Sequence, residues 1–340
     1  MRFDPARRSL IGLLVTAPFA AGAAAQDQNT IPIFDAHTHP SRNSRSFGQG
    51  LDAARELMPH LNVTTTILAP PPFPEIERGL YGAEELRSAA RKDSGRFAFT
   101  AGGESLNPMI QQTPPDKVTS DIMARFAREA ETVAQTGAVG FGEVAAEHFS
   151  SGIGRHPYES SPPDHPLFLA LADICAKYGM PLELHMEAVP HNMPFPPARS
   201  GSPNPPDLKE NIAAFERLLD HNPKARIVWL HAGWDLSGER SVPLMRSLME
   251  RHVNLFMTIK SDHSGKRLNA PFLPDGTVKP AWIAMLRAFP ERFVIGSDQF
   301  FDEGPERIQM ARNLINGIPP DLAPRIGNEN VGRIYRLSQR

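Results

Sequence analysis

Residues suited to metal binding end a short apolar run near the start of this sequence. In Ile33-Phe-Asp-Ala-His-Thr-His39, two histidines, His37 and His39, lie two positions apart. Because side chains alternate along a β-strand, both imidazoles would point the same way and offer two nitrogen atoms to one cation. A single His-x-His pair is a weak signal, so further ligands are needed to define a site.

Three later apolar runs also end in a candidate ligand, namely His185, His231 and Asp298. One buried histidine is more often a hydrogen-bonded core residue, but four histidines and an aspartate at matched strand ends favour a metal site. We expect Leu184, Leu230 and Ile295 to alternate with this set and to face the helices.

Two glutamates belong to the same pattern. Glu143 ends another candidate strand, where it would bridge two cations, bind one, or orient a histidine. Glu183 shares a face with His185 but lies one step deeper, where an unpaired carboxylate is costly. Glu183 is therefore expected to support a ligand rather than to bind metal.

The elements that would position these residues alternate regularly along the chain. β-rich runs occupy residues 31–34, 63–68, 96–100, 138–141, 181–185, 226–231, 254–259 and 292–296, and amphipathic helical segments occupy 52–61, 83–92, 122–135, 167–178, 208–220, 243–251, 282–289 and 305–316. Eight βα units in succession predict a closed (β/α)8 TIM barrel, one domain over residues 30–340. Its metal site would lie at the C-terminal ends of the strands.

Composition narrows the classes of partner and ligand. The 340 residues include 36 basic and 38 acidic side chains, a balance that argues against nucleic acid and in favour of a small-molecule substrate. A single cysteine, Cys175, excludes an intramolecular disulfide and a Cys-based zinc site. Any metal must therefore be held by His, Asp or Glu.

The first 25 residues have the pattern of an export signal. Arg7 and Arg8 precede an apolar run over residues 10–20, and alanines follow at 23–25. The arginine pair indicates a twin-arginine signal and a periplasmic or secreted protein. The run is shorter than the roughly 20 residues that a membrane span needs, so no membrane association is expected after removal of the signal.

Three proline-rich loops, at 70–74, 157–166 and 190–206, follow predicted strands at the end where barrel enzymes build their sites. They predict a walled pocket. Candidate anion-binding side chains in such loops are Arg155, His156, Lys260, Asp262 and His263, and candidate apolar lining residues are Phe73, Tyr81, Phe149, Phe195, Trp234 and Phe300.

Taken together, residues 31–337 resemble the amidohydrolase superfamily, specifically its amidohydrolase-related branch. The resemblance rests on Asp35-x-His37-x-His39, His185, the stretch Leu230–Trp234, Gly296-Ser-Asp298, and a closing segment over Ile326–Tyr335. It implies that His37, His39 and Asp298 hold the more buried metal. His185 and His231 would hold a second metal or, in a mononuclear enzyme, divide into ligand and acid/base.

The resemblance implies a metal-dependent hydrolase that cleaves an ester, lactone, amide or phosphoester bond with a metal-activated water. One or two divalent cations are expected, with Zn²⁺ favoured and Mn²⁺, Fe²⁺ or Co²⁺ as alternatives. Asp298 would act as general base and His231 or the cation would polarise the scissile group. Two alternatives are a mononuclear decarboxylase of the same superfamily and an exported metal- or solute-binding protein without turnover.

Overall fold

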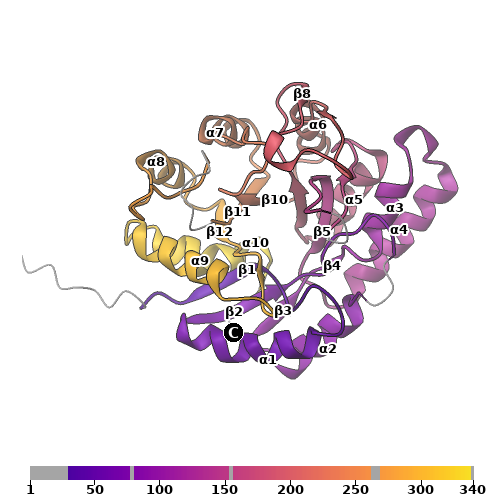
Figure 1. The fold of residues 1–340 in the computed structure, drawn as a ribbon. Helices are drawn as coiled ribbons and strands as arrows, with labels where there is room; N and C mark the ends of the chain where they lie inside the picture. The colour runs from indigo at the N-terminus through magenta and orange to yellow at the C-terminus, as the bar shows by residue number, and fades with distance from the viewer. Residues whose placement is uncertain (1–29, 77–79, 153–155, 262–268, 338–340) are drawn as a thin grey trace, which may run out of the picture.

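The computed structural model describes residues 30–76, 80–152, 156–261 and 269–337. In these residues a ring of helices surrounds a barrel of strands (Figure 1). The predicted signal at residues 1–25 and the candidate anion-binding residues Arg155, Asp262 and His263 lie outside the described residues. Among the helices of the described part, none has the length and apolar character needed to cross a membrane.

The strands are β1 (Ile33–His39), β2 (Val63–Leu68), β3 (Phe97–Phe99), β4 (Ala101–Gly102), β5 (Phe141–His148), β6 (Glu159–Ser160), β7 (Leu182–Met186), β8 (Met193–Pro194), β9 (Asp207–Leu208), β10 (Ile227–Ala232), β11 (Leu255–Ile259), β12 (Phe293–Ile295) and β13 (Gln299–Phe300). The helices are α1 (Phe47–His60), α2 (Ala83–Lys92), α3 (Leu106–Gln112), α4 (Ser120–Gln135), α5 (Pro166–Tyr178), α6 (Ile212–His221), α7 (Val242–Arg251), α8 (Pro280–Ala288), α9 (Glu306–Gly317) and α10 (Asn330–Ile334).

Two interrupted strands join the sheets into a parallel (β/α)8 barrel, as predicted. One sheet runs β13-β1-β2-β3 and the other β12-β11-β10-β7-β5-β4. β3 and β4 are separated by Thr100 alone. The Thr100 N–H donates to the Leu68 carbonyl of β2, and the Ala101 N–H donates to the Gly140 carbonyl just before β5. β12 and β13 are likewise two parts of one strand. β12 pairs with β11, β13 pairs with β1, and between them the Asp298 N–H donates to the His37 carbonyl of β1. The C-terminal ends of the parallel barrel strands therefore meet at one mouth.

Element boundaries differ from the prediction at a few places, each for a tertiary reason. The strand predicted at 138–141 lies further along the chain, because β5 begins only at Phe141 and continues to His148, where its end pairs antiparallel with β6. The helix predicted from 208 begins at Ile212, because Leu208 pairs with Met193 in the β8–β9 ribbon. Helix α3 was not predicted from the sequence.

Local sequence signals account for where several helices begin and end. The Thr119 side chain accepts the Ile122 N–H at the start of α4, and the Ser241 side chain accepts the Leu244 N–H at the start of α7. Gly179 ends α5 in the left-handed conformation at φ 65°, as its glycine predicted.

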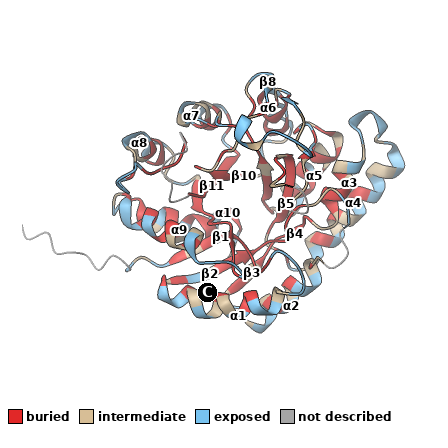
Figure 2. Ribbon diagram, in the orientation of Figure 1, coloured by how far each residue is buried: buried red, intermediate tan, exposed pale blue. Residues whose placement is uncertain are grey.

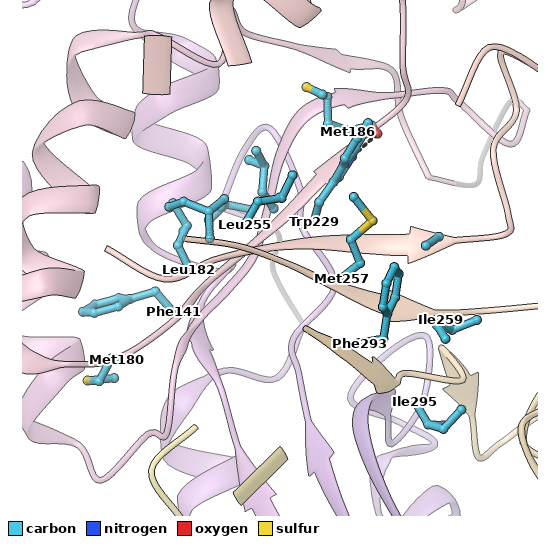
Figure 3. Packing of buried hydrophobic residues seen from close by; sticks show 14 of the residues in the cluster. Phe141, Met180, Leu182, Met186, Trp229, Leu255, Met257, Ile259, Phe293 and Ile295 are labelled. Carbon is cyan, nitrogen blue, oxygen red and sulfur yellow. Dashed lines mark hydrogen bonds between the residues drawn. The ribbon is translucent and has the colours of Figure 1, made fainter. Parts of the chain in front are cut away.

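The main hydrophobic core lies between the strands and the helical ring, where buried residues are concentrated (Figure 2). Side chains such as Leu182 of β7, Trp229 of β10, Met257 of β11 and Phe293 of β12 pack in it (Figure 3). The Trp229 indole N–H donates to the Met186 carbonyl at 2.8 Å, which satisfies its polar atom inside the core.

A second buried cluster fills the inside of the barrel, and we call it the barrel floor. It consists of Ala36, Ile67, Val228, Leu230, Phe256, Val294, Val331, Ile334 and Tyr335, which come from opposite strands and from α10. The segment predicted as a closing helix is a π-helical turn at Arg325–Glu329 followed by α10, and it contributes to this cluster. The prediction that Leu230 faces the helices is wrong, because Leu230 packs with Val228 and Val331 inside the barrel.

Candidate metal centre

Glu143 lies at the centre of the four predicted histidine ligands. Its Oε2 is 3.4 Å from His37 Nε2 and 3.5 Å from His39 Nε2. Its other oxygen, Oε1, is 2.7 Å from His185 Nδ1 and 3.3 Å from His231 Nε2. The two oxygens of one carboxylate therefore face two different pairs of histidines.

Asp298 completes the set beside the first pair. Its Oδ1 is 3.2 Å from His39 Nε2 and 3.9 Å from His37 Nε2. Its Oδ2 accepts hydrogen bonds from Lys260 and, at 2.8 Å, from Arg307. One carboxylate oxygen thus faces the histidines, and the other is held by two cations. We refer to His37, His39, Glu143, His185, His231 and Asp298 as the main cluster.

Backbone strain at the mouth turns two of these side chains into the main cluster. His231 has φ 64° and Asp298 has φ 56°, left-handed conformations that cost a non-glycine residue on the order of 1 kcal/mol or more. Hydrogen bonds hold both, since His231 N–H donates to Thr258 Oγ1 at 2.9 Å and Asp298 N–H donates to His37 O at 2.9 Å. The turn at His231 explains why Leu230 can face inward and its neighbour still reach the mouth.

A second layer orients the histidines of β1. His37 Nδ1 donates to Glu183 Oε2 at 3.2 Å, and Tyr335 donates to Glu183 Oε1 at 2.7 Å. His39 Nδ1 donates to the Ala69 carbonyl at 2.9 Å. Each Nδ1 proton is therefore fixed, and each Nε2 is presented to the main cluster. Glu183 lies where the sequence predicted, supporting a ligand.

The carboxylates of the main cluster are strongly acidic. Burial alone would raise the pKa of Asp298, but Lys260 and Arg307 outweigh it and hold that pKa well below its ordinary range. Burial would also raise the pKa of Glu143. The neighbouring histidines, above all His37, outweigh burial and hold that pKa well below its ordinary value. Both groups therefore carry negative charge at neutral pH.

The histidines respond differently to their surroundings. Burial lowers the pKa of His185, but the carboxylates of Glu143 and Glu187 outweigh it and raise that pKa to about 9. Burial dominates at His231 and lowers its pKa to about 3, which keeps the ring neutral. The His231 ring can therefore bind a cation directly, whereas a cation bound by His185 would have to displace a proton from that ring.

The donor set fits divalent cations. Two ligands of one tetrahedral Zn²⁺, with bonds of about 2.1 Å, lie roughly 3.4 Å apart. Three separations among His37, His39, Glu143 and Asp298, of 3.2, 3.4 and 3.5 Å, match that spacing, and the fourth, 3.9 Å between His37 Nε2 and Asp298 Oδ1, is longer. His37 Nε2 is also buried without a hydrogen-bond partner, although buried polar atoms normally have one. A cation would satisfy this atom.

The main cluster opens into a cavity of about 1020 Å³. Predicted lining residues that reach it are Phe73, Phe149, Trp234 and Phe300, together with His156 and Lys260. Two predicted lining residues do not reach it. Tyr81 is buried and donates to the Ser41 carbonyl at 2.9 Å, and Phe195 packs on Phe149 in a separate small cluster.

Three cavity residues that contact the main cluster were not predicted from the sequence. Glu187 lies 3.7 Å from His185 Nε2, and the two-residue spacing that identified His37 and His39 could have found it. Arg307 comes from α9 and had no such signal. His148 ends β5 after two register irregularities that alter the side-chain alternation.

The sequence matches the family model described as amidohydrolase over residues 34–337. No curated protein matches the chain. A 2,6-dihydroxybenzoate decarboxylase structure with bound 2,6-dihydroxybenzoate is 18% identical, with a TM-score of 0.52, and the match covers 90% of this chain and 100% of that one.

Two further solved structures are similar over most of their length. A dihydroxybenzoic acid decarboxylase from Polaromonas sp. JS666, with bound manganese and 2-nitroresorcinol, is 14% identical with a TM-score of 0.50, covering 91% of this chain and 98% of that one. A dihydroorotase from Campylobacter jejuni is 13% identical with a TM-score of 0.50, covering 91% and 84% respectively. At these identities the likeness concerns the fold, whereas the family match spans nearly the whole barrel. The chain therefore belongs to the amidohydrolase family.

Proposed function

We propose that this protein is a hydrolase that holds two divalent cations and cleaves an ester, lactone, amide or phosphoester bond of a small organic molecule. The position of Glu143 carries the proposal. Its Oε2 faces His37 and His39, while its Oε1 faces His185 and His231. A carboxylate that offers one oxygen to each of two ligand groups is suited to bridging two metal ions.

His37, His39 and Asp298 would hold one cation, and His185 and His231 the other. Nitrogen and oxygen donors suit Zn²⁺, and Mn²⁺, Fe²⁺ or Co²⁺ accept the same set. The manganese in the similar decarboxylase structure supports a divalent metal. When bound, such cations lower the pKa of water from about 15.7 toward 7 and polarise a carbonyl or phosphoryl oxygen.

The protein's own side chains would hold the charges around the reacting bond. Asp298 enters the reaction ionised, with Oδ1 toward the histidines and Oδ2 engaged by Lys260 and Arg307. Before Oδ2 can accept a proton as general base, either Lys260 or Arg307 must give up its hydrogen bond to it. A carboxylate or phosphate group of a substrate in the cavity would compete with Asp298 for Lys260 and Arg307. Trp234 and Phe300 would supply an apolar wall.

A mononuclear decarboxylase is the second candidate. Lys260 and Arg307 favour it, because their positively charged side chains lie beside the main cluster, where they could hold the carboxylate of an aromatic acid. The decarboxylases of similar fold support the same idea. Metal count and product separate the candidates, since only the lyase releases carbon dioxide.

Replacing the bridging carboxylate tests the proposal. We expect Glu143→Gln to lose at least one equivalent of metal per chain and to lose hydrolysis of a panel of esters, lactones and phosphoesters. The matched control is Glu104→Gln, a half-buried carboxylate outside the main cluster, whose metal content and activity should equal wild type. An unchanged metal content in Glu143→Gln would refute the bridge. One metal per main cluster with carbon dioxide release from a carboxylated aromatic would favour the lyase.

We further propose that the protein is exported by the twin-arginine route. The support is the arginine pair, apolar run and alanines of residues 1–25. Fractionation of cells expressing the full chain, compared with Arg7→Lys/Arg8→Lys, tests this. Equal periplasmic recovery of both would contradict the twin-arginine route.

A further inference from the structure

A second group of candidate ligands lies outside the main cluster. It consists of His148 at the end of β5, His156 in the following loop, and Glu159 of β6, and we call it the outer cluster. One ring nitrogen of each histidine and one carboxylate oxygen lie within 4.8 Å of one another. The two imidazole centroids are 3.7 Å apart, and His156 Nε2 is 3.6 Å from Glu159 Oε2. That last separation is close to the roughly 3.4 Å between two ligands of one tetrahedral cation.

Glu159 has a buried oxygen without a hydrogen bond. The residue is 1% exposed. Its Oε1 accepts a hydrogen bond from Asn107 Nδ2 at 2.6 Å, and Asn107 is itself fixed by accepting the Ala145 N–H at 2.9 Å. Its Oε2 has no hydrogen-bond donor in the described structure. A buried carboxylate oxygen in this state is costly unless it meets a proton or a cation.

The two histidines also have ring nitrogens whose hydrogen bonding is incomplete. His148 Nδ1 is buried and has no hydrogen-bond partner among the described residues. Both nitrogens of His156 approach carbonyl oxygens, Nδ1 that of Pro157 at 2.9 Å and Nε2 that of Pro72. A neutral imidazole has one N–H and carbonyls only accept, so one of these contacts lacks a proton. A cation bound to Nε2, which lies 3.6 Å from Glu159 Oε2, would replace the contact with the Pro72 carbonyl.

We propose that the outer cluster is a separate binding site for one divalent cation of the zinc type, held by His148, His156 and Glu159. Two imidazoles and a carboxylate are a three-ligand set that leaves a coordination position open. His148 and His156 line the same cavity as the main cluster, and the ring of His148 lies 4.2 Å from that of His185. The open position would therefore be available to an anionic group of a molecule bound in that cavity.

The test counts metal ions on the tag-free full chain. Chelator-treated protein is dialysed against buffered Zn²⁺, and zinc per chain is measured by elemental mass spectrometry. We expect Glu159→Gln and His156→Asn each to bind one equivalent fewer than wild type, and Glu104→Gln to bind the wild-type number. Co²⁺ substitution gives a second readout, because the visible absorption of one cobalt ion should be missing from both outer-cluster variants.

Folding of each variant is checked by its melting temperature without metal, and zinc-edge anomalous scattering from wild-type crystals locates the ions directly. Equal zinc counts in wild type, Glu159→Gln and His156→Asn, or anomalous scattering without a peak at these residues, would overturn the inference. The difference between wild type and Glu159→Gln tests the outer cluster, whereas the number that Glu159→Gln retains tests the two-metal main cluster. The two proposals can therefore fail independently.

Discussion

The floor and the mouth of this barrel are made by the same strands but differ in chemistry. On β10, Val228 and Leu230 belong to the apolar floor, and the next residue, His231, belongs to the main cluster. On the last strand, Val294 lies in the floor and Asp298 at the mouth. The floor is filled by side chains and closed by α10, whereas the mouth opens into a cavity.

The mouth also contains the features that a fold optimised for stability would avoid. It has left-handed backbone at His231 and Asp298, a buried His37 nitrogen without a hydrogen bond, and several buried carboxylates. The floor has no such groups among its members. We infer that packing energy from the floor and the surrounding core stabilises strain at the mouth, and that the two regions can be perturbed separately.

The largest effect is expected at the mouth. Asp298→Asn should lower kcat by about 10³-fold, because the neutral amide is a poor ligand and cannot accept the proton. The protein should stay folded, because the side-chain shape is kept, but its melting temperature should fall by several degrees, because Lys260 and Arg307 lose their carboxylate partner. Steady-state kinetics and thermal unfolding measure both quantities. Asp275→Asn, in an exposed loop, is the matched control. An active Asp298→Asn enzyme would remove Asp298 from the reaction.

Removing a histidine ligand should have the next largest effect. We expect His37→Ala to lose at least one equivalent of metal and most activity while remaining folded, because Ala removes the Nε2 that faces both Glu143 and Asp298. Elemental analysis and circular dichroism report on the two outcomes. His60→Ala, at the end of α1, provides the comparison. Wild-type metal content in His37→Ala would refute the main cluster as a metal site.

The opposite result is expected at the floor. Leu230→Ala should lower the free energy of unfolding by about 2–5 kcal/mol, because it leaves a cavity in a packed interior. Metal content and kcat of the folded fraction should stay near wild type. Denaturant unfolding measures the first, and elemental analysis and kinetics the second. Loss of metal without loss of stability would show that floor and mouth are not separable in this way.

Much of this division could be predicted from sequence, because hydrophobic runs mark the strands and ligands stand at their ends. The side to which Leu230 points could not, since it depends on the left-handed turn at His231. The partners of Asp298 could not be predicted either, because Arg307 comes from helix α9 and Lys260 from the end of another strand, and their contacts form only in the folded protein. His148 was hidden by the irregular pairing of β5. Periodicity reports regular backbone, and functional residues here lie where the backbone departs from it.

The smallest effect is expected at Tyr335, a floor residue that is hydrogen-bonded to Glu183, the support of His37. Its ring packs in the floor, and its hydroxyl donates to Glu183, which in turn accepts from His37. Tyr335→Phe keeps the ring and removes one hydrogen bond, so stability should fall by only about 1–2 kcal/mol. Glu183 would then hold His37 less firmly, and zinc affinity should weaken by roughly tenfold. Competition with a chromogenic chelator measures that affinity. An unchanged affinity would mean that the floor supports the mouth through packing alone, whereas a tenfold loss would identify Tyr335 as the hydrogen-bonded link between them.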